Sequence, residues 1–180
     1  MNIRLIGYGA FAAVVVTGLL LIGLSTGVIA PLLGDGYQPG GTDGDGPIDT
    51  DYEHTTVTVM DNETGEELGQ VEAAIADTRS KRYLGLSATD HLPENRGMLF
   101  VHGFSDDHTY VMREMSFGID IVFIDADRVI TTIHEAPEPG PGEDGNDQRY
   151  SGEARYVLEV NRGWTTDHGV EVGDEAAFEL

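Results

Sequence analysis

The segment from Arg96 to Asp125, RGMLFVHGFSDDHTYVMREMSFGIDIVFID, constrains the fold of this chain more than any other. It contains three short apolar runs, Met98–Val101, Tyr110–Met112 and Ile119–Ile124, which polar turn residues separate. Apolar runs of about four to eight residues between turns are typical of short strands packed into one core. The segment therefore predicts a compact, β-rich domain.

More strands and two short helices are expected around this segment. A short helix should begin after Asp77 or Thr78, continue through Arg82 and end at Gly85, because Asp and Thr cap helix N-termini and Gly terminates helices. Ala136–Gln148 predicts a long surface loop. The other expected elements are strands at Thr55–Met60, Leu68–Ala76, Met98–Val101, His108–Arg113, Ile119–Ile124, Val129–His134, Arg155–Val160 and Ala176–Glu179, and a helical turn at Trp164–His168.

These elements together predict the fold class. Seven or eight short strands with one or two short helices make an α+β fold, here a compact, barrel-like and mostly antiparallel β domain. Side chains two residues apart on a strand share a face, so one set should lie inside the core. The residues expected to be buried are Met98, Phe100, Met112, Ile121 and Phe123.

The N-terminal segment predicts a membrane anchor. Leu5 to Gly34 contains no charged residue, and spanning a bilayer takes roughly 20 apolar residues. We expect residues 1–33 to be a transmembrane anchor with one helix over 5–30, a cytoplasmic N-terminus beside Arg4, and an extracellular domain. The alternative is a cleaved signal peptide, but its apolar region is about 7–15 residues long, and Val28–Pro31 is a poor cleavage site.

A tether and a single domain follow the anchor. Residues 34–51 are rich in Gly, Asp and Pro and predict a flexible linker, and residues 52–180 form the extracellular domain. Asp43 and Asp45 are compatible with a calcium loop, but the other ligand positions are missing, which favours the linker. The chain has no cysteine, which excludes a disulfide framework and a lipidated-cysteine anchor.

The charge of the chain restricts its partners. Asp and Glu number 32 against 10 Lys and Arg, so the net charge is −22, and Lys81 is the single lysine. Beyond Tyr52 there are 27 acidic and 9 basic residues, a net −18, which disfavours binding to nucleic acid. Acidic residues spread along the chain are typical of haloarchaeal-type adaptation to molar salt, where charge is screened within about 3 Å. The alternative is an acidic surface that binds cations or basic partners.

Short pieces spread over Val71 to Phe178 have a familiar order and spacing. They are Ala76-Asp77-Thr78, Arg82, Gly85-Leu86, Leu92-Pro93, Gly97-Met98-Leu99-Phe100, Met112, Asp120, Phe123-Ile124-Asp125, Tyr150-Ser151, Tyr156-Val157-Leu158-Glu159-Val160, Gly169-Val170 and Val172-Gly173-Asp174. In this arrangement they resemble the DUF192 (UPF0127) family, a domain of unknown function. The resemblance implies a shared fold for nearly the whole domain.

The chain departs from the family pattern at its polar positions. The family pattern contains Phe-Trp-Met-Lys-Asn-Thr, followed by a proline and Leu-Asp. In this chain the corresponding residues are Tyr110–Met115, followed by Ser116–Asp120. The usual Gly-Leu-Met ends in Ser87. The apolar scaffold is better kept than the polar cluster, so the resemblance implies the fold more strongly than an activity.

Arg82, Met112, Arg113 and Asp120 are the candidate ligand-binding residues. Arg82 at the end of a short helix and Asp120 at the start of a strand are expected within ion-pair reach, where the guanidinium could bind an anionic or sugar ligand. The alternative is a structural ion pair between helix and sheet. Arg113 and Glu114 should point to opposite faces of their strand, so one of them is expected in solvent.

Metal, cofactor and nucleophile sites are not expected. The histidines are scattered without ligand spacing, and Ser151 lies in no nucleophile motif. The six histidines are His54, His91, His102, His108, His134 and His168.

Two functions remain open. The first is a membrane-tethered extracellular binding or accessory module, whose ligand or partner is a glycan, an envelope component or a protein. The second is a hydrolase of a polar extracellular polymer, with Asp120 and Glu159 as acid and base about 5–10 Å apart. Glu159 lies between Leu158 and Val160 and is expected to face solvent or an ion-pair partner. This placement favours the binding module.

Overall fold

The computed structural model describes residues 51–180. The expected anchor, and the expected linker apart from its last residue, lie outside the described residues. Within residues 51–180, no helix has the length and apolar character needed to cross a membrane.

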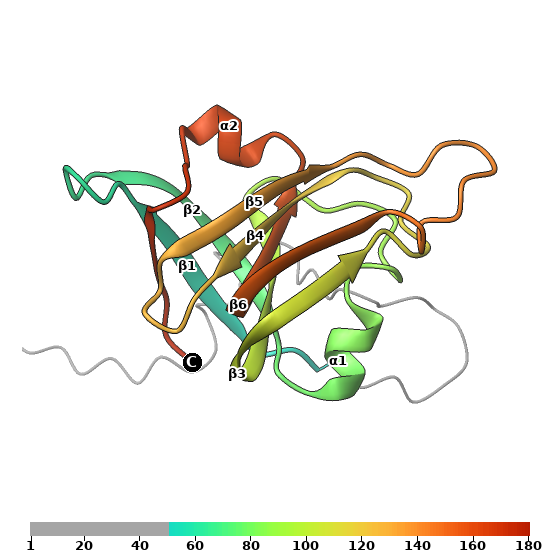
Figure 1. Ribbon diagram of the computed structural model, residues 1–180, viewed down its shortest axis with the longest axis horizontal. Helices are drawn as coiled ribbons and strands as arrows, with labels where there is room; N and C mark the ends of the chain where they lie inside the picture. Colours follow the sequence, from blue (N-terminus) through green and yellow to red (C-terminus); the bar gives the residue numbers. More distant parts are fainter. Residues whose placement is uncertain (1–50) are drawn as a thin grey trace, which may run out of the picture. The chain divides into compact units, whose positions relative to one another are not determined.

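The described residues form seven strands and two short helices (Figure 1). The strands are β1 (His54–Met60), β2 (Glu67–Ala76), β3 (Arg96–Val111), β4 (Ile119–Ile124), β5 (Ile130–Ala136), β6 (Arg149–Asn161) and β7 (Glu175–Ala177). The helices are α1 (Arg79–Leu84) and α2 (Trp164–His168). The Thr78 hydroxyl caps α1 by accepting from the Lys81 amide, and Gly85 ends the helix with φ +56°, as predicted.

The strands form one strongly curved sheet in the order β5-β4-β6-β3-β2-β1-β7. All neighbouring strands are antiparallel except β2 and β3, which are parallel. A bridge between Val129 and Glu175 links the two edges of the sheet. The prediction of a mostly β domain with a few short helices is therefore confirmed, and the sheet forms a half-barrel.

Each face of the sheet carries its own apolar core, because side chains alternate along every strand. The first core contains the five residues that were expected to be buried, each at most 2% exposed. These residues are Met98, Phe100, Met112, Ile121 and Phe123. The second core contains Leu99, Val122, Ile124, Tyr156, Leu158 and Val160 among others. Strand β4 and the second half of β6, residues 156–160, are buried on both faces. A polar side chain there therefore faces either the first or the second core.

Strand β3 differs from the prediction of two separate strands. It runs through both expected segments and pairs with β6 on either side of an irregularity. Val101 lies opposite Tyr156 and Asp106 opposite Ala154, so β3 has extra residues relative to β6 at this point. Extra residues on one strand bend it. The bend brings the Phe100 and Tyr110 rings edge to face, with centroids 5.0 Å apart.

Candidate functional site

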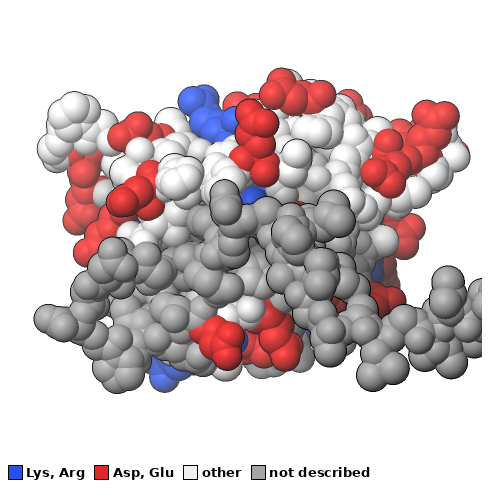
Figure 2. Space-filling view, turned by 180° about the vertical axis from the view of Figure 1, so that it is seen from behind, with Lys and Arg blue, Asp and Glu red and all other residues white. Residues whose placement is uncertain are grey.

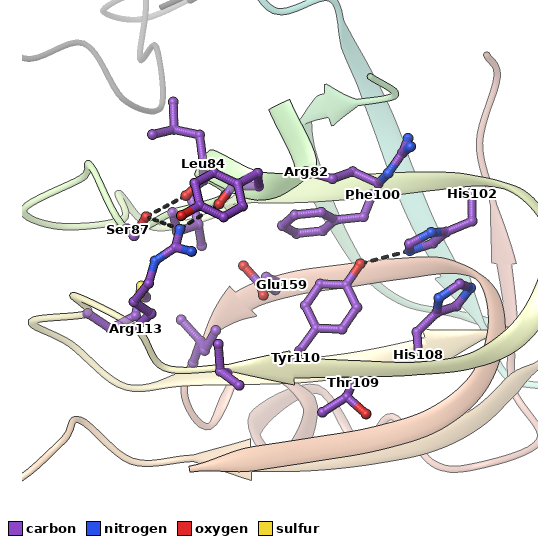
Figure 3. A pocket seen from close by; sticks show the side chains of 16 residues that line it. Arg82, Leu84, Ser87, Phe100, His102, His108, Thr109, Tyr110, Arg113 and Glu159 are labelled. Carbon is purple, nitrogen blue, oxygen red and sulfur yellow. Dashed lines mark hydrogen bonds between the residues drawn. The ribbon is translucent and has the colours of Figure 1, made fainter. Parts of the chain in front are cut away.

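A cavity of about 290 Å³ lies between the end of α1 and the two halves of the bent β3 (Figure 3). Its polar wall residues are Arg82, Ser87, His102, His108, Thr109, Tyr110, Arg113 and Glu159. Its apolar wall includes Leu86, Phe100, Val111 and Ile119. The volume is close to the lower end of small-molecule sites, which start at about 300 Å³. The cavity is therefore sized for one small molecule.

Glu159 is the buried carboxyl of this cavity. It lies on β6 opposite Met98 and Ile121, on the face of the first core, and is 5% exposed. Its side chain makes no hydrogen bond or ion pair with any described residue. Burial raises the pKa of Glu159 to about 8, so the carboxyl is protonated at neutral pH. The prediction that Glu159 faces solvent or an ion-pair partner is wrong, because both faces of β6 are covered around this residue.

Asp120 lies on the opposite face of the sheet. It is fully buried on β4 opposite Val160, and its carboxylate accepts hydrogen bonds from the Gly163 amide (3.0 Å), the Thr165 amide (2.9 Å) and the Thr165 hydroxyl (2.7 Å). Gly163 has no side chain to cap α2, so Asp120 caps that helix from a neighbouring strand. Asp120 is therefore a structural residue that stabilises the start of α2.

Two predicted pairings of Asp120 are therefore wrong. Arg82 donates from Nη1 to the carbonyl oxygens of Asp77 (2.5 Å) and Val101 (2.7 Å), so it joins α1 to β3 rather than to Asp120. Asp120 and Glu159 point to opposite faces of the sheet, so they share no cleft as an acid and base pair. The alternation of side chains shows which residues of one strand share a face. It does not show which face of β4 matches which face of β6, because that depends on the register between the two strands.

Of the four predicted ligand-binding residues, Arg82 and Arg113 line the cavity. Arg113 donates from Nη2 to the Tyr83 carbonyl (2.5 Å) and the Ser87 hydroxyl (3.3 Å), and its guanidinium stacks on the Tyr83 ring at 4.2 Å. Met112 is fully buried in the first core outside the cavity lining, and Asp120 is excluded as described. Arg113 and Ser87, two departures from the family pattern, contact each other at this wall.

A histidine and tyrosine cluster forms the other side of the cavity, and sequence reasoning missed it. His102 Nε2 lies 3.0 Å from the Tyr110 hydroxyl, and the His102 and His108 rings stack with centroids 3.6 Å apart. Burial, then the neighbouring His108 and Arg82, lowers the pKa of His102 to about 4. Burial, then Glu159, raises the pKa of Tyr110. The polar Gly103–Asp107 segment was the available signal, because a sharp bend there places residues 102 and 108 face to face.

The electrostatics of the cavity contrast with those of the surface. At neutral pH its wall carries the positive charges of Arg82 and Arg113, while Glu159, His102 and Tyr110 are uncharged. Acidic side chains occur at many places on the face shown in Figure 2, and basic ones at few. In residues 51–180, no group of three or more His, Asp or Glu side chains is placed to hold a metal ion. The arrangement suits an uncharged or anionic organic molecule.

The fold and site define a β half-barrel domain with one small polar cavity beside its first helix. Residues 59–178 match the DUF192 family, described as "Uncharacterized ACR", and the chain belongs to this family.

Solved structures similar to this chain include two with a TM-score above 0.5. One is a protein of Sinorhizobium meliloti 1021 described as a proposed transcription regulator, with 26% identity and a TM-score of 0.62 over 71% of this chain and 95% of that one. The other is a protein of unknown function from Novosphingobium aromaticivorans DSM 12444, with 25% identity and a TM-score of 0.59 over 74% and 91%. No curated protein matches the chain.

Proposed function

We propose that this domain is a membrane-tethered extracellular binding module that takes a small carboxylate-bearing ligand, derived from a glycan or envelope component, into the cavity beside α1. The observation that carries the proposal is the cavity itself, which has two arginines in its wall and the unpartnered carboxyl of Glu159 inside. A guanidinium stays protonated and binds carboxylates through charge-assisted hydrogen bonds. An anionic ligand therefore meets positive charge at this site in a chain whose net charge is −22.

The acidity of the domain and the charge of the ligand are compatible at high salt. At molar ionic strength the field of surface carboxylates is screened within about 3 Å, whereas groups inside a cavity are screened much less. The proposal therefore includes a halophilic environment for the extracellular domain. The thermal midpoint of unfolding should rise between 0.1 M and 2 M KCl, and a midpoint that does not move would contradict halophilic adaptation.

A hydrolase is the second candidate, and the raised pKa of Glu159 favours it, because a carboxyl protonated at neutral pH suits a general acid. Among the residues that line the cavity, however, Glu159 is the single carboxyl. Glycoside hydrolysis normally requires a second carboxyl about 5–10 Å away. Binding is therefore preferred to hydrolysis.

Two other roles fit less well. The similar S. meliloti protein is described as a proposed transcription regulator. Regulation by direct contact with DNA is disfavoured here, because the net charge beyond Tyr52 is −18. A secreted, untethered form requires cleavage near residue 31. Mass spectrometry of the membrane fraction should find the intact N-terminus, and a mature chain in the medium that starts near Leu32 would contradict the tether.

Calorimetric titration of the full-length chain in detergent and 2 M KCl tests the binding function. The probes are glucuronate and cyclohexanecarboxylate, with glucose and cyclohexanol as uncharged counterparts. At least one acid should bind, and both uncharged probes should bind much more weakly. Arg113→Gln should lower the affinity for the acid by about 10- to 100-fold, since a hydrogen bond to a charged group contributes about 1.5–3 kcal/mol. The matched control is Arg149→Gln, which removes an exposed arginine of β6 outside the cavity. The proposal would be overturned if neither acid bound, or if Arg113→Gln and Arg149→Gln lowered the affinity for the acid equally.

A further inference from the structure

Two polar groups in the cavity wall have no partner among the described residues. One is the Glu159 carboxyl, and the other is Nε2 of His108, which is buried without a hydrogen bond. More than about nine in ten buried polar groups in proteins are hydrogen-bonded, and an unsatisfied one costs about 1–3 kcal/mol. Both side chains line one cavity, so a bound molecule can supply a partner for the Glu159 carboxyl and for the accessible part of the His108 ring. Nε2 of His108 itself has less than 1 Å² of accessible surface and stays closed to the ligand.

The chemistry of these two groups differs from that of the arginines. A buried carboxyl with no cation beside it is protonated, so Glu159 presents an O–H donor as well as acceptor oxygens. A neutral imidazole has one donor and one acceptor nitrogen, whereas a guanidinium can only donate. Hydroxyl groups both donate and accept, so they match Glu159 and His108, while a carboxylate matches an arginine.

These two kinds of group lie at different ends of the cavity. Figure 3 shows Arg113 on one side, His102 and His108 on the other, and Glu159 between them, close to the Phe100 and Tyr110 rings. The aromatic rings present apolar surface to the C–H groups of a saturated ring. With about 290 Å³ of space, the cavity accommodates one such ring rather than a chain of them.

We propose that the ligand is a polyhydroxylated ring acid, a monosaccharide acid of the uronic type, whose carboxylate binds Arg113 and whose hydroxyls bind Glu159 and His108. This inference rests on the proposed binding function and names its ligand class. Glu159 and His108 are then the residues that distinguish a sugar acid from a plain carboxylic acid. A site built to hydrogen-bond hydroxyls disfavours an analogue without them, because its buried polar groups stay unpaired.

The test compares glucuronate with cyclohexanecarboxylate, which has the same ring size and charge but no hydroxyls. In calorimetric titrations of the full-length chain in 2 M KCl, glucuronate should bind at least tenfold more tightly. Glu159→Leu should remove most of this preference and leave the affinity for cyclohexanecarboxylate unchanged or improved. Glu159→Gln, whose amide also donates and accepts, should keep most of the preference, and His108→Phe should reduce it. The matched control is Glu153→Gln, at an exposed glutamate on the same strand.

The outcomes separate this inference from the binding function. Equal affinity of the native chain for the two acids would overturn the sugar-acid inference and leave the binding function intact. If neither acid bound, the binding function itself would fail. Glu159→Leu could lower the affinity for both acids to the same extent while the thermal midpoint of unfolding stays unchanged. That result would show that Glu159 does not recognise the ligand's hydroxyl groups and would overturn the sugar-acid inference. The comparison in the native chain needs no variant, so a folding failure of Glu159→Leu does not remove the test.

Discussion

Asp120 and Glu159 lie on adjacent strands of one sheet, and both are buried, yet their surroundings are opposite. Asp120 accepts three hydrogen bonds on the face of the second core, two from backbone amides and one from a hydroxyl. Glu159 faces the cavity on the other side of the sheet and has no hydrogen-bond partner among the described residues. Burial alone therefore does not separate a structural carboxyl from a functional one, whereas the presence or absence of partners does.

The two environments have different energetic consequences. The donors around Asp120 replace the water that its carboxylate loses on folding, so burial stabilises the start of α2. Glu159 has no such donors, and it avoids the cost of a buried charge by staying protonated. A side chain that lowers stability but faces a cavity is typical of a binding or catalytic site.

The largest effect is expected from Asp120→Ala. The substitution leaves the Gly163 and Thr165 amides without an acceptor in a buried place, so the free energy of unfolding should fall by about 3–5 kcal/mol. Denaturant unfolding in 2 M KCl measures the loss. Asp120→Asn keeps one acceptor oxygen and should cost less, and the folded variant should still bind acids. A loss below about 1 kcal/mol would mean that Asp120 does not hold α2.

A pH-dependent effect, gained gradually and similar in total size, is expected from Glu159→Gln. The folded pKa of Glu159 is about 8 against an ordinary value of 4.5, so between these pH values the unfolded chain releases a proton that the folded chain keeps. The stability contributed by Glu159 is therefore present below pH 4.5 and lost as the pH rises to about 8. Gln does not ionise, so the variant does not lose this stability. The free energy of unfolding of the variant minus that of the native chain should therefore rise by about 1.4 kcal/mol per pH unit in this window. A constant difference from pH 5 to 8 would place the carboxylate in a solvated environment.

The smallest effect is expected at His102. Its pKa is lowered from 6.5 to about 4, so the folded chain keeps the ring neutral where the unfolded chain binds a proton. The stability it contributes is present above pH 6.5 and lost as the pH falls to about 4. Histidine NMR shifts should show His102 neutral from pH 5 to 8, and Tyr110→Phe, which removes the hydroxyl beside Nε2, should alter its shifts. Titration of His102 near 6.5 would contradict the buried cluster.

Local sequence signals predicted the elements that short-range physics determines. Thr78 and Gly85 delimit α1 because capping and a positive φ depend on the residue itself. Alternation within one strand correctly placed Met98 with Phe100 and Ile121 with Phe123 in one core.

The errors concern features that several strands determine together. The covering of both faces of β6 buries Glu159, and the register of β4 against β6 turns Asp120 away from it. The irregularity in β3 brings His102 to His108, although five residues separate them in the chain. Arg82 and Arg113 line the cavity because long cationic side chains in the last turn of a short helix and after a strand extend to a cavity beside them, and their role in ligand binding stays a prediction.

The most direct test of the contrast between the two carboxyls is the protonation state of Glu159. Carboxyl ¹³C NMR of the full-length chain in 2 M KCl, with the Glu159 signal assigned by its loss in Glu159→Gln, follows this state across the pH range. We expect a protonated carboxyl at pH 7 that ionises near pH 8. An ionised Glu159 at pH 7, titrating near its ordinary value of 4.5, would show that the carboxyl is solvated or paired and would contradict the account.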